Sequence, residues 1–177
     1  MPRYHPALVV LHWLLALLII SELLFGKFGL SAVPNSDPAK VGLLLPHMAL
    51  GMAILALMLI RVLVRWRTAL PPEADTGIPA LNRVGKLTHW VTYAVVIGMS
   101  VSGFALSLAA GLPDIVFAGS GDPLPADFSA FTARAVHGAL ATVLGLLVML
   151  HVTAALYHQF IRKDGLFARM WFGARRL

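Results

Sequence analysis

Residues 133–160 read ARAVHGALATVLGLLVMLHVTAALYHQF, an apolar run with one charged residue, Arg134. The run contains three histidines, His137, His151 and His158, spaced fourteen and then seven residues apart. At about 100° per residue these spacings fall close to whole turns, so the three imidazoles lie along one stripe of one helix. The rise from His137 to His151 is ~21 Å, most of the ~30 Å hydrocarbon thickness. Because imidazoles in lipid are costly unless they face a bundle interior, the stripe predicts metal centres stacked across a membrane.

The composition also indicates an integral membrane protein. Of the 177 residues, 59% are hydrophobic and 12% are charged, whereas soluble domains have about 25% charged residues. We expect residues 1–177 to form a single membrane domain. The absence of cysteine excludes disulfides, iron–sulfur clusters and thiolate zinc sites. The net charge of +6 does not predict nucleic-acid binding, because the basic residues flank apolar spans instead of forming one face.

Four apolar segments are long enough to cross a membrane: about residues 7–25, 42–64, 87–112 and 133–160. The sequence therefore predicts an all-α fold, an integral membrane four-helix bundle. The first segment is longer than the ~7–15 apolar residues of a signal peptide, and no clear small-x-small cleavage site follows it. We interpret it as a span.

Basic residues predict the orientation of the bundle. Between spans two and three we place Arg61, Arg65, Arg67, Arg83 and Lys86, and after span four Arg162, Lys163, Arg169, Arg175 and Arg176. The loops on the other side hold fewer cations, namely Lys27, Lys40 and Arg134, together with Asp37, Asp114, Asp122 and Asp127. By the positive-inside rule, both termini are cytoplasmic. The tail 166–177 mixes apolar residues with arginines and is predicted to form an interfacial segment on anionic lipid.

The remaining histidines are placed by their depth in the membrane. His47 and His137 each lie about five residues inside the outer start of their spans, so they are level. Two level histidines on facing helices are what bis-imidazole ligation of a haem iron requires. At the cytoplasmic end, His151 lies deeper than His158 and is the better ligand candidate. Spacing alone leaves open whether its partner is His12 or His89, and His158 suits a haem propionate or another polar ligand.

Other interpretations of these residues stay open at this point. Gly51 and Gly138 could give a flat macrocycle room, or they could simply let helices pack closely. A lone intramembrane histidine often only bonds a neighbouring helix, but paired depths favour ligands over that reading. Zinc or copper would also accept imidazole. No carboxylate adjoins the histidines in sequence, however, and the depths make two separated pairs instead of one cluster.

Several short motifs resemble bacterial cytochrome b561. They are His12-Trp13, Pro46-His47, Thr88-His89-Trp90, the His137–His151 spacing, and the ending His158-Gln-Phe-Ile-Arg-Lys-Asp-Gly. That family is similar to the cytochrome b subunits of nickel–iron hydrogenases and formate dehydrogenases. The resemblance implies two b haems in the bacterial inner membrane. It implies that His47 with His137 ligates the outer haem and His12 with His151 the inner one.

The resemblance further implies an oxidoreductase of the superoxide oxidase kind, which takes electrons from superoxide outside and reduces ubiquinone. Lys27, Lys40 and Arg134 could steer the anion, and Arg134 could instead bond a haem propionate. We expect the quinone near His89, Trp90 and His158, although Trp90 also suits an aromatic belt. Two alternatives remain. One is a cytochrome b subunit serving a separate dehydrogenase, hydrogenase or periplasmic redox partner, and the other is a haem-free channel or transporter.

Overall fold

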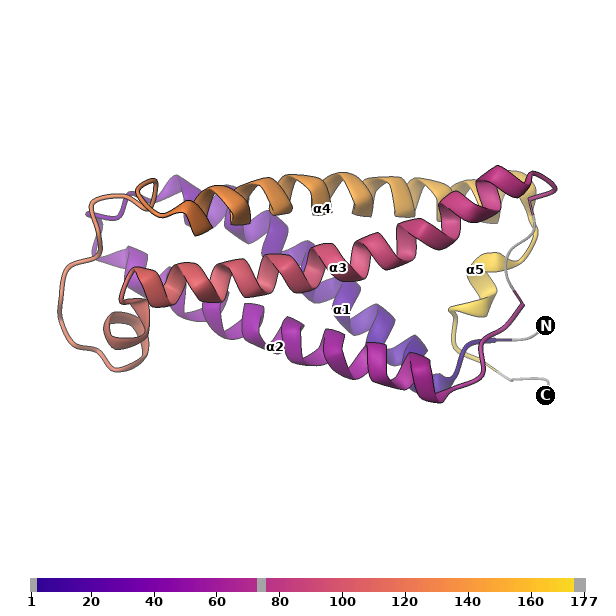
Figure 1. Cartoon of the computed structure of the whole chain (residues 1–177), viewed down its shortest axis with the longest axis horizontal. Helices are drawn as coiled ribbons and strands as arrows, with labels where there is room; N and C mark the ends of the chain where they lie inside the picture. The colour runs from indigo at the N-terminus through magenta and orange to yellow at the C-terminus, as the bar shows by residue number, and fades with distance from the viewer. Residues whose placement is uncertain (1–2, 73–75, 174–177) are drawn as a thin grey trace.

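The computed structural model describes residues 3–72 and 76–173, and every element of secondary structure in these ranges is helical (Figure 1). The four long helices are α1 (Pro6–Leu24), α2 (Ala39–Arg67), α3 (Pro79–Ala109) and α4 (Thr132–Leu156). Turns of π-helix and 3₁₀-helix extend α1 to Ala32, and a turn of π-helix extends α4 to Arg162. A short helix, α5 (Leu166–Arg169), follows. The predicted all-α fold is confirmed.

Four helical segments are long and apolar enough to span a membrane, as the sequence predicts. They comprise residues 6–32, 39–67, 79–109 and 132–162, with 27, 29, 31 and 31 residues. Span three differs from its predicted bounds. It begins at Pro79 instead of residue 87, because the fixed φ of proline suits the first turn of a helix. It stops before residue 112, where Gly111 has a positive φ of 66° and ends the helix.

The helices pack in chain order, α1 on α2, α2 on α3 and α3 on α4. Figure 1 shows α2 and α4 along opposite sides of the bundle, with α3 between them in this view and α1 crossing behind. The side chain of Arg3 donates to the Phe172 carbonyl over 2.8 Å, so both described chain ends lie at one end of the bundle. We call this the terminal end, and the opposite one, with the connections 33–38 and 110–131, the distal end. Which of them faces the cytoplasm remains a prediction.

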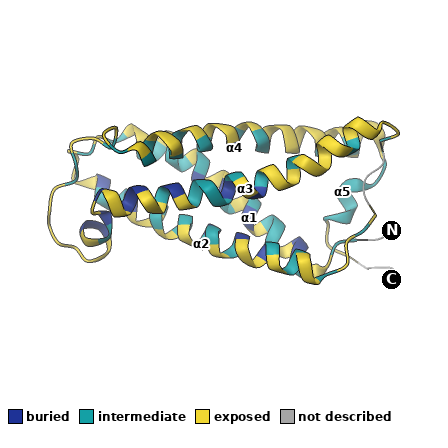
Figure 2. Ribbon diagram, in the orientation of Figure 1, coloured by how far each residue is buried: buried dark blue, intermediate teal, exposed yellow. Residues whose placement is uncertain are grey.

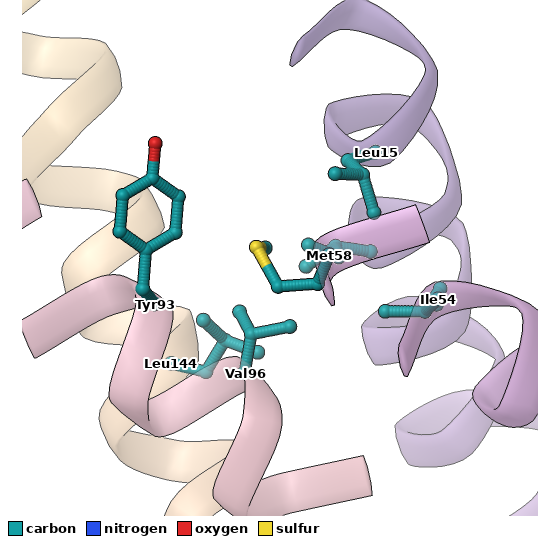
Figure 3. Packing of buried hydrophobic residues seen from close by; sticks show 7 residues of the cluster. Leu15, Ile54, Met58, Tyr93, Val96 and Leu144 are labelled. Carbon is teal, nitrogen blue, oxygen red and sulfur yellow. The ribbon is translucent and has the colours of Figure 1, made fainter. Parts of the chain in front are cut away.

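The central core of the bundle separates its two ends. It is made of side chains from all four long helices (Figure 3), namely Leu15, Ile19, Ile54, Met58, Tyr93, Val96 and Leu144. A second cluster closes the distal end and consists of Leu44, Ala110, Leu112, Ile115 and Val116. Along α4, Leu144 lies between His137 and His151, so the central core is interposed between the histidines of the two ends.

Helix α4 exposes most of its surface (Figure 2). Leu144 is its one buried residue, whereas Leu146 and Met149 are 64% and 68% exposed. Large apolar side chains directed away from the bundle are what a lipid-facing surface requires, since lipid tails solvate them as well as a protein core does.

Two basic regions differ from the sequence analysis. Arg61, predicted to lie in a connection, is inside α2 and only 6% exposed, so that prediction was wrong. The predicted interfacial segment docks on α1, because the Trp13 indole Nε1 donates to the Met170 carbonyl over 2.8 Å and its ring lies 5.3 Å from that of Trp171. Residues 174–177 of that segment, and residues 73–75 of the α2–α3 connection, lie outside the described ranges.

We expect Trp13→Phe to loosen the docked tail while leaving the four spans in place. The substitution keeps an aromatic ring but removes the indole N–H that bonds Met170, a loss of about 1 kcal/mol for a hydrogen bond of this kind. Limited proteolysis should cleave the tail of the variant faster than that of the wild type. Trp66→Phe is the control, because Trp66 is 70% exposed. Equal cleavage rates in wild type and Trp13→Phe would contradict the proposed docking contact.

Candidate haem-binding site

At the distal end the structure brings His47 of α2 and His137 of α4 together. Their ring centroids lie 6.1 Å apart and the ring planes are 89° from parallel. Two metal–imidazole bonds of about 2 Å each, plus the two ring radii, come to roughly 6 Å between centroids. The distal pair therefore has the spacing of two imidazoles that share one metal.

The ring of His137 is held by α3. Its Nδ1 lies 3.0 Å from the Met99 carbonyl and 3.2 Å from the Ser102 hydroxyl, which itself donates to the same carbonyl. A histidine whose Nδ1–H donates to a backbone carbonyl has Nε2 left for a metal. Gly103 makes this close approach feasible, because a Cβ at that position would lie 3.0 Å from His137 Cε1. Neither Ser102 nor Gly103 was singled out from the sequence.

The ring of His47 is held by α1. Its Nδ1 lies 2.5 Å from Oε2 of Glu22, a carboxylate only 7% exposed. A Cβ at Gly26, one turn further along the chain, would lie at an ordinary contact distance of 3.8 Å from His47 Cε1, so the ring also packs against this turn. No carboxylate adjoins the histidines along the chain, and the one that contacts His47 comes from a neighbouring helix and was not predicted. A glutamate within an apolar span was the available signal, since such residues mark functional sites.

At the terminal end three histidines from three helices lie near one another. The ring centroid of His151 on α4 is 6.0 Å from that of His12 on α1 and 6.0 Å from that of His89 on α3. The interplanar angles, 65° and 66°, are also alike. In this terminal trio, His151 can therefore pair with either His12 or His89. These are the same two pairings that the spacing in the sequence leaves open.

A buried cation lies beside the terminal trio. The Arg61 guanidinium donates to the Leu8 carbonyl of α1 over 2.6 Å, and its Cζ lies 6.0 Å from the centre of the Tyr93 ring. Leu8 precedes His12 by one helical turn. From the sequence, Arg61 was interpreted only as one of the basic residues that predict orientation, and its place beside these histidines was not predicted.

The glycines that could make room for a flat cofactor differ in what lies beside them. A Cβ at Gly51 or Gly145 would meet no atom within 4 Å, so each leaves open space beside its helix. Gly138 instead makes room for a side chain of its own helix, since a Cβ there would lie 3.0 Å from Nη1 of Arg134. The open glycines and the two imidazole spacings fit haem.

The three cations predicted to steer superoxide differ in their exposure and in their hydrogen bonds. Lys40 is only 5% exposed, and its ammonium donates to the Leu30 and Val33 carbonyls over 2.5 and 2.7 Å. It therefore anchors the α1–α2 connection, whereas Lys27 is exposed and Arg134 lies one turn before His137.

The three predicted quinone-site residues have separate partners. His158 Nδ1 lies 2.6 Å from Asp164 Oδ2, while Trp90 packs near Tyr93 and under Arg65. Within the described residues no hydrogen bond or ring contact joins His158 to His89 or Trp90.

Asp164 is the carboxylate that holds the ring of His158. Partial burial of Asp164 raises its pKa, but hydrogen bonds from His158 and the Leu166 amide, with the charge of Arg162, outweigh burial and hold the pKa below its ordinary value. Asp164 is therefore ionised at neutral pH and gives His158 a charged acceptor.

Comparisons with known proteins agree over the length of the chain. A family profile described as prokaryotic cytochrome b561 matches residues 3–173. The chain is 31% identical over 176 residues to a protein named probable superoxide oxidase CybB of Yersinia pestis, with 95% of each chain covered. It is 29% identical over 175 residues to cytochrome b562 of Cereibacter sphaeroides, covering 96% of this chain and 95% of that one. It is also 29% identical over 175 residues to cytochrome b561 homolog 2 of Escherichia coli K12, covering 95% and 90%.

We expect Gly103→Ala to lower the haem content per chain. The added methyl carbon would lie 3.0 Å from His137 Cε1, closer than van der Waals contact, so the ring or α3 must shift. Gly98→Ala is the matched control on the same helix, because its Cβ meets Leu140 at an ordinary 3.6 Å. Haem and protein are measured together in each purified variant. Equal haem content in the two variants would show that the position of His137 tolerates this crowding.

Proposed function

Because the chain belongs to the prokaryotic cytochrome b561 family, we propose that it holds two b haems, one toward each end of the bundle, and carries electrons across the bacterial inner membrane. Haem b binding and membrane electron transfer follow from the family. The number of haems rests on the two histidine groups. The observation that carries the proposal is that each group, on facing helices, has ring centroids 6.0 to 6.1 Å apart.

The distal pair, His47 and His137, holds the outer haem in this proposal, with the terminal end in the cytoplasm. His151 holds the inner haem together with His12. The equal distance of His89 from His151 leaves the geometry neutral between the two partners, and the motif resemblance to cytochrome b561 favours His12. Arg134, one turn before His137, is placed to bond a propionate of the outer haem.

A haem iron held between two imidazoles has no open coordination position and supplies one-electron transfer. The protein's part is to hold the two imidazole groups apart with an apolar layer between them. His137 and His151 are separated by ~21 Å along α4, and the central core lies between them, including Val96 at 1% and Leu144 at 3% exposure. This apolar layer excludes water and protons from the space between the two groups.

Superoxide at the distal end is the proposed electron donor. Two superoxide anions each give up one electron and leave as dioxygen. The relative from Yersinia pestis is named a probable superoxide oxidase, and Arg134 and Lys27 lie at the distal end of this chain, where cations raise the local concentration of a small anion. Lys40 adds to this field but is itself bonded to backbone carbonyls.

Ubiquinone at the terminal end is the proposed acceptor. It takes up two electrons and two protons to give ubiquinol. His89, 6.0 Å from His151, and Trp90 beside it offer a polar and an apolar contact at this end. His158, whose Nδ1 lies 2.6 Å from the ionised Asp164, adds a polar group near the predicted cytoplasmic surface.

A second candidate function is that of an electron-transfer subunit serving a separate dehydrogenase, hydrogenase or periplasmic redox partner. The relatives from Cereibacter sphaeroides and Escherichia coli are named only as cytochromes, so their names, unlike that of the relative from Yersinia pestis, give no substrate of their own. The haem-free channel of the sequence analysis is not proposed, since the family implies haem.

We expect the histidine variants to fall into two groups by the haem they lose. His47→Ala and His137→Ala should lose the same haem and keep the other, because each removes one of two imidazoles 6.1 Å apart. His151→Ala and His12→Ala should lose the second haem, and His89→Ala should keep both. Haem per chain and the reduced-minus-oxidised spectrum measure this, with His5→Ala, at the exposed start of α1, as the control. Loss of different haems from His47→Ala and His137→Ala would disprove the distal pairing.

The donor is tested on the purified protein. Adding superoxide should reduce the protein, and with ubiquinone present it should produce ubiquinol continuously, because the proposal couples the two ends. If superoxide leaves the protein oxidised while dithionite reduces it, superoxide is not the donor. A dehydrogenase or periplasmic cytochrome that co-purifies and reduces the protein would then favour the second candidate function.

A further inference from the structure

Glu22 is a carboxylate in the apolar part of α1 with a single polar neighbour. It is 7% exposed, and its Oε2 lies 2.5 Å from Nδ1 of His47. Both atoms are buried, and although they lie at ion-pair distance from each other, within the described residues neither has a hydrogen-bond partner of standard geometry. A charge buried in a membrane-spanning helix is costly unless it is paired and has a use. The contact with His47 therefore indicates that Glu22 has a role at the distal pair.

The outer turn of α1 is shaped around the ring of His47. Glu22 and Gly26 are four residues apart and so lie on one face of the helix. Glu22 meets Nδ1, a Cβ at Gly26 would lie 3.8 Å from Cε1, and the Phe25 ring centroid is 6.5 Å from that of His47. These contacts hold the Nδ1 edge of the ring against α1, while the ring centroid faces His137 at 6.1 Å.

We propose that Glu22 is a positioning residue for His47 and lowers the reduction potential of the outer haem. The proposal rests on the proposed function, in which His47 is a ligand of that haem. A histidine that binds iron through Nε2 carries its proton on Nδ1, and a carboxylate that accepts this proton fixes the tautomer and makes the imidazole a stronger donor. A stronger, more negative ligand stabilises the oxidised iron.

The polar groups next to His137 and the terminal trio do not carry the negative charge that Glu22 brings to His47. His137 Nδ1 faces a neutral carbonyl and a neutral hydroxyl, those of Met99 and Ser102. At the terminal end the buried charge is positive, because Arg61 is 6% exposed and bonds the turn before His12. A carboxylate at the distal ligand and a guanidinium beside the terminal trio both make the outer haem the weaker electron acceptor.

Two cations, Lys40 and Arg134, lie near the distal end, and within the described residues neither forms an ion pair with Glu22. The Lys40 ammonium is bonded to the Leu30 and Val33 carbonyls, and Nη1 of Arg134 lies against Gly138. Within the described residues, His47 is the one ion-pair partner of Glu22. The Glu22 carboxylate is therefore the charge in direct contact with a proposed ligand. Electrons are then favoured to move from the distal to the terminal end.

The test is a redox titration of the full-length haem-loaded protein at fixed pH, following each haem by its absorbance. In Glu22→Gln the acceptor oxygen stays but its charge is removed. We expect the oxidised-to-reduced ratio of the outer haem at a given ambient potential to fall about tenfold or more, which is a rise of about 59 mV for one electron. The inner haem should titrate as in the wild type. Asp114→Asn is the matched control, because it removes an exposed carboxylate from the same end and should leave both haems unchanged.

The variant His47→Ala separates failure of this proposal from failure of the proposed function. If His47→Ala loses the outer haem but Glu22→Gln titrates like the wild type, Glu22 does not set the potential, and the distal pairing stands. If His47→Ala keeps the outer haem, the pairing itself is wrong. Should Glu22→Gln fail to hold the haem, Glu22→Asp is titrated instead. If Glu22→Asp binds the outer haem and that haem has the low potential of the wild type, the proposal is supported. If Glu22→Asp does not restore the outer haem, the proposal is overturned.

Discussion

The structure depends on one constraint, that a histidine or a charged side chain surrounded by hydrocarbon needs a polar partner within the protein, because lipid offers none. His137 of α4 finds the Met99 carbonyl on α3, His47 of α2 finds Glu22 on α1, and Arg61 of α2 finds the Leu8 carbonyl on α1. Each contact ties two spans together and sets how each helix is rotated about its axis. The apolar core between the ends fills the space that these contacts leave.

The same contacts give the two ends different electrostatic character. Helix α1 brings a carboxylate to the distal end and receives a guanidinium toward the terminal end, so one helix takes part in both. The histidines themselves are similar at the two ends, with ring centroids 6.0 and 6.1 Å apart. Besides the third histidine at the terminal end, the two ends differ in the charge of the side chains next to the histidines, and such neighbours tune a metal site through its ligands.

Much of this arrangement could be predicted from the sequence, because apolar length and helical periodicity depend on residues near one another in the chain. The four spans, the family, and the meeting of His47 with His137 belong to this class. Contacts between spans were not predictable in the same way, because they depend on helix rotation. For this reason the contact of Glu22 with His47 and that of Arg61 with the Leu8 carbonyl were missed. Neither the spacing in the sequence nor the structure decides whether His12 or His89 pairs with His151, because both rings are equidistant from it.

Helix α4 supplies a histidine to each group, yet Leu144 is its one buried side chain. It is also the last of the four spans to leave the ribosome, since synthesis runs from the N-terminus. Neither histidine group is complete until this final span has entered the membrane. A cofactor bound between the histidines of each group, as proposed above, would therefore also hold α4 to the helices that carry the partner histidines, α1 and α2.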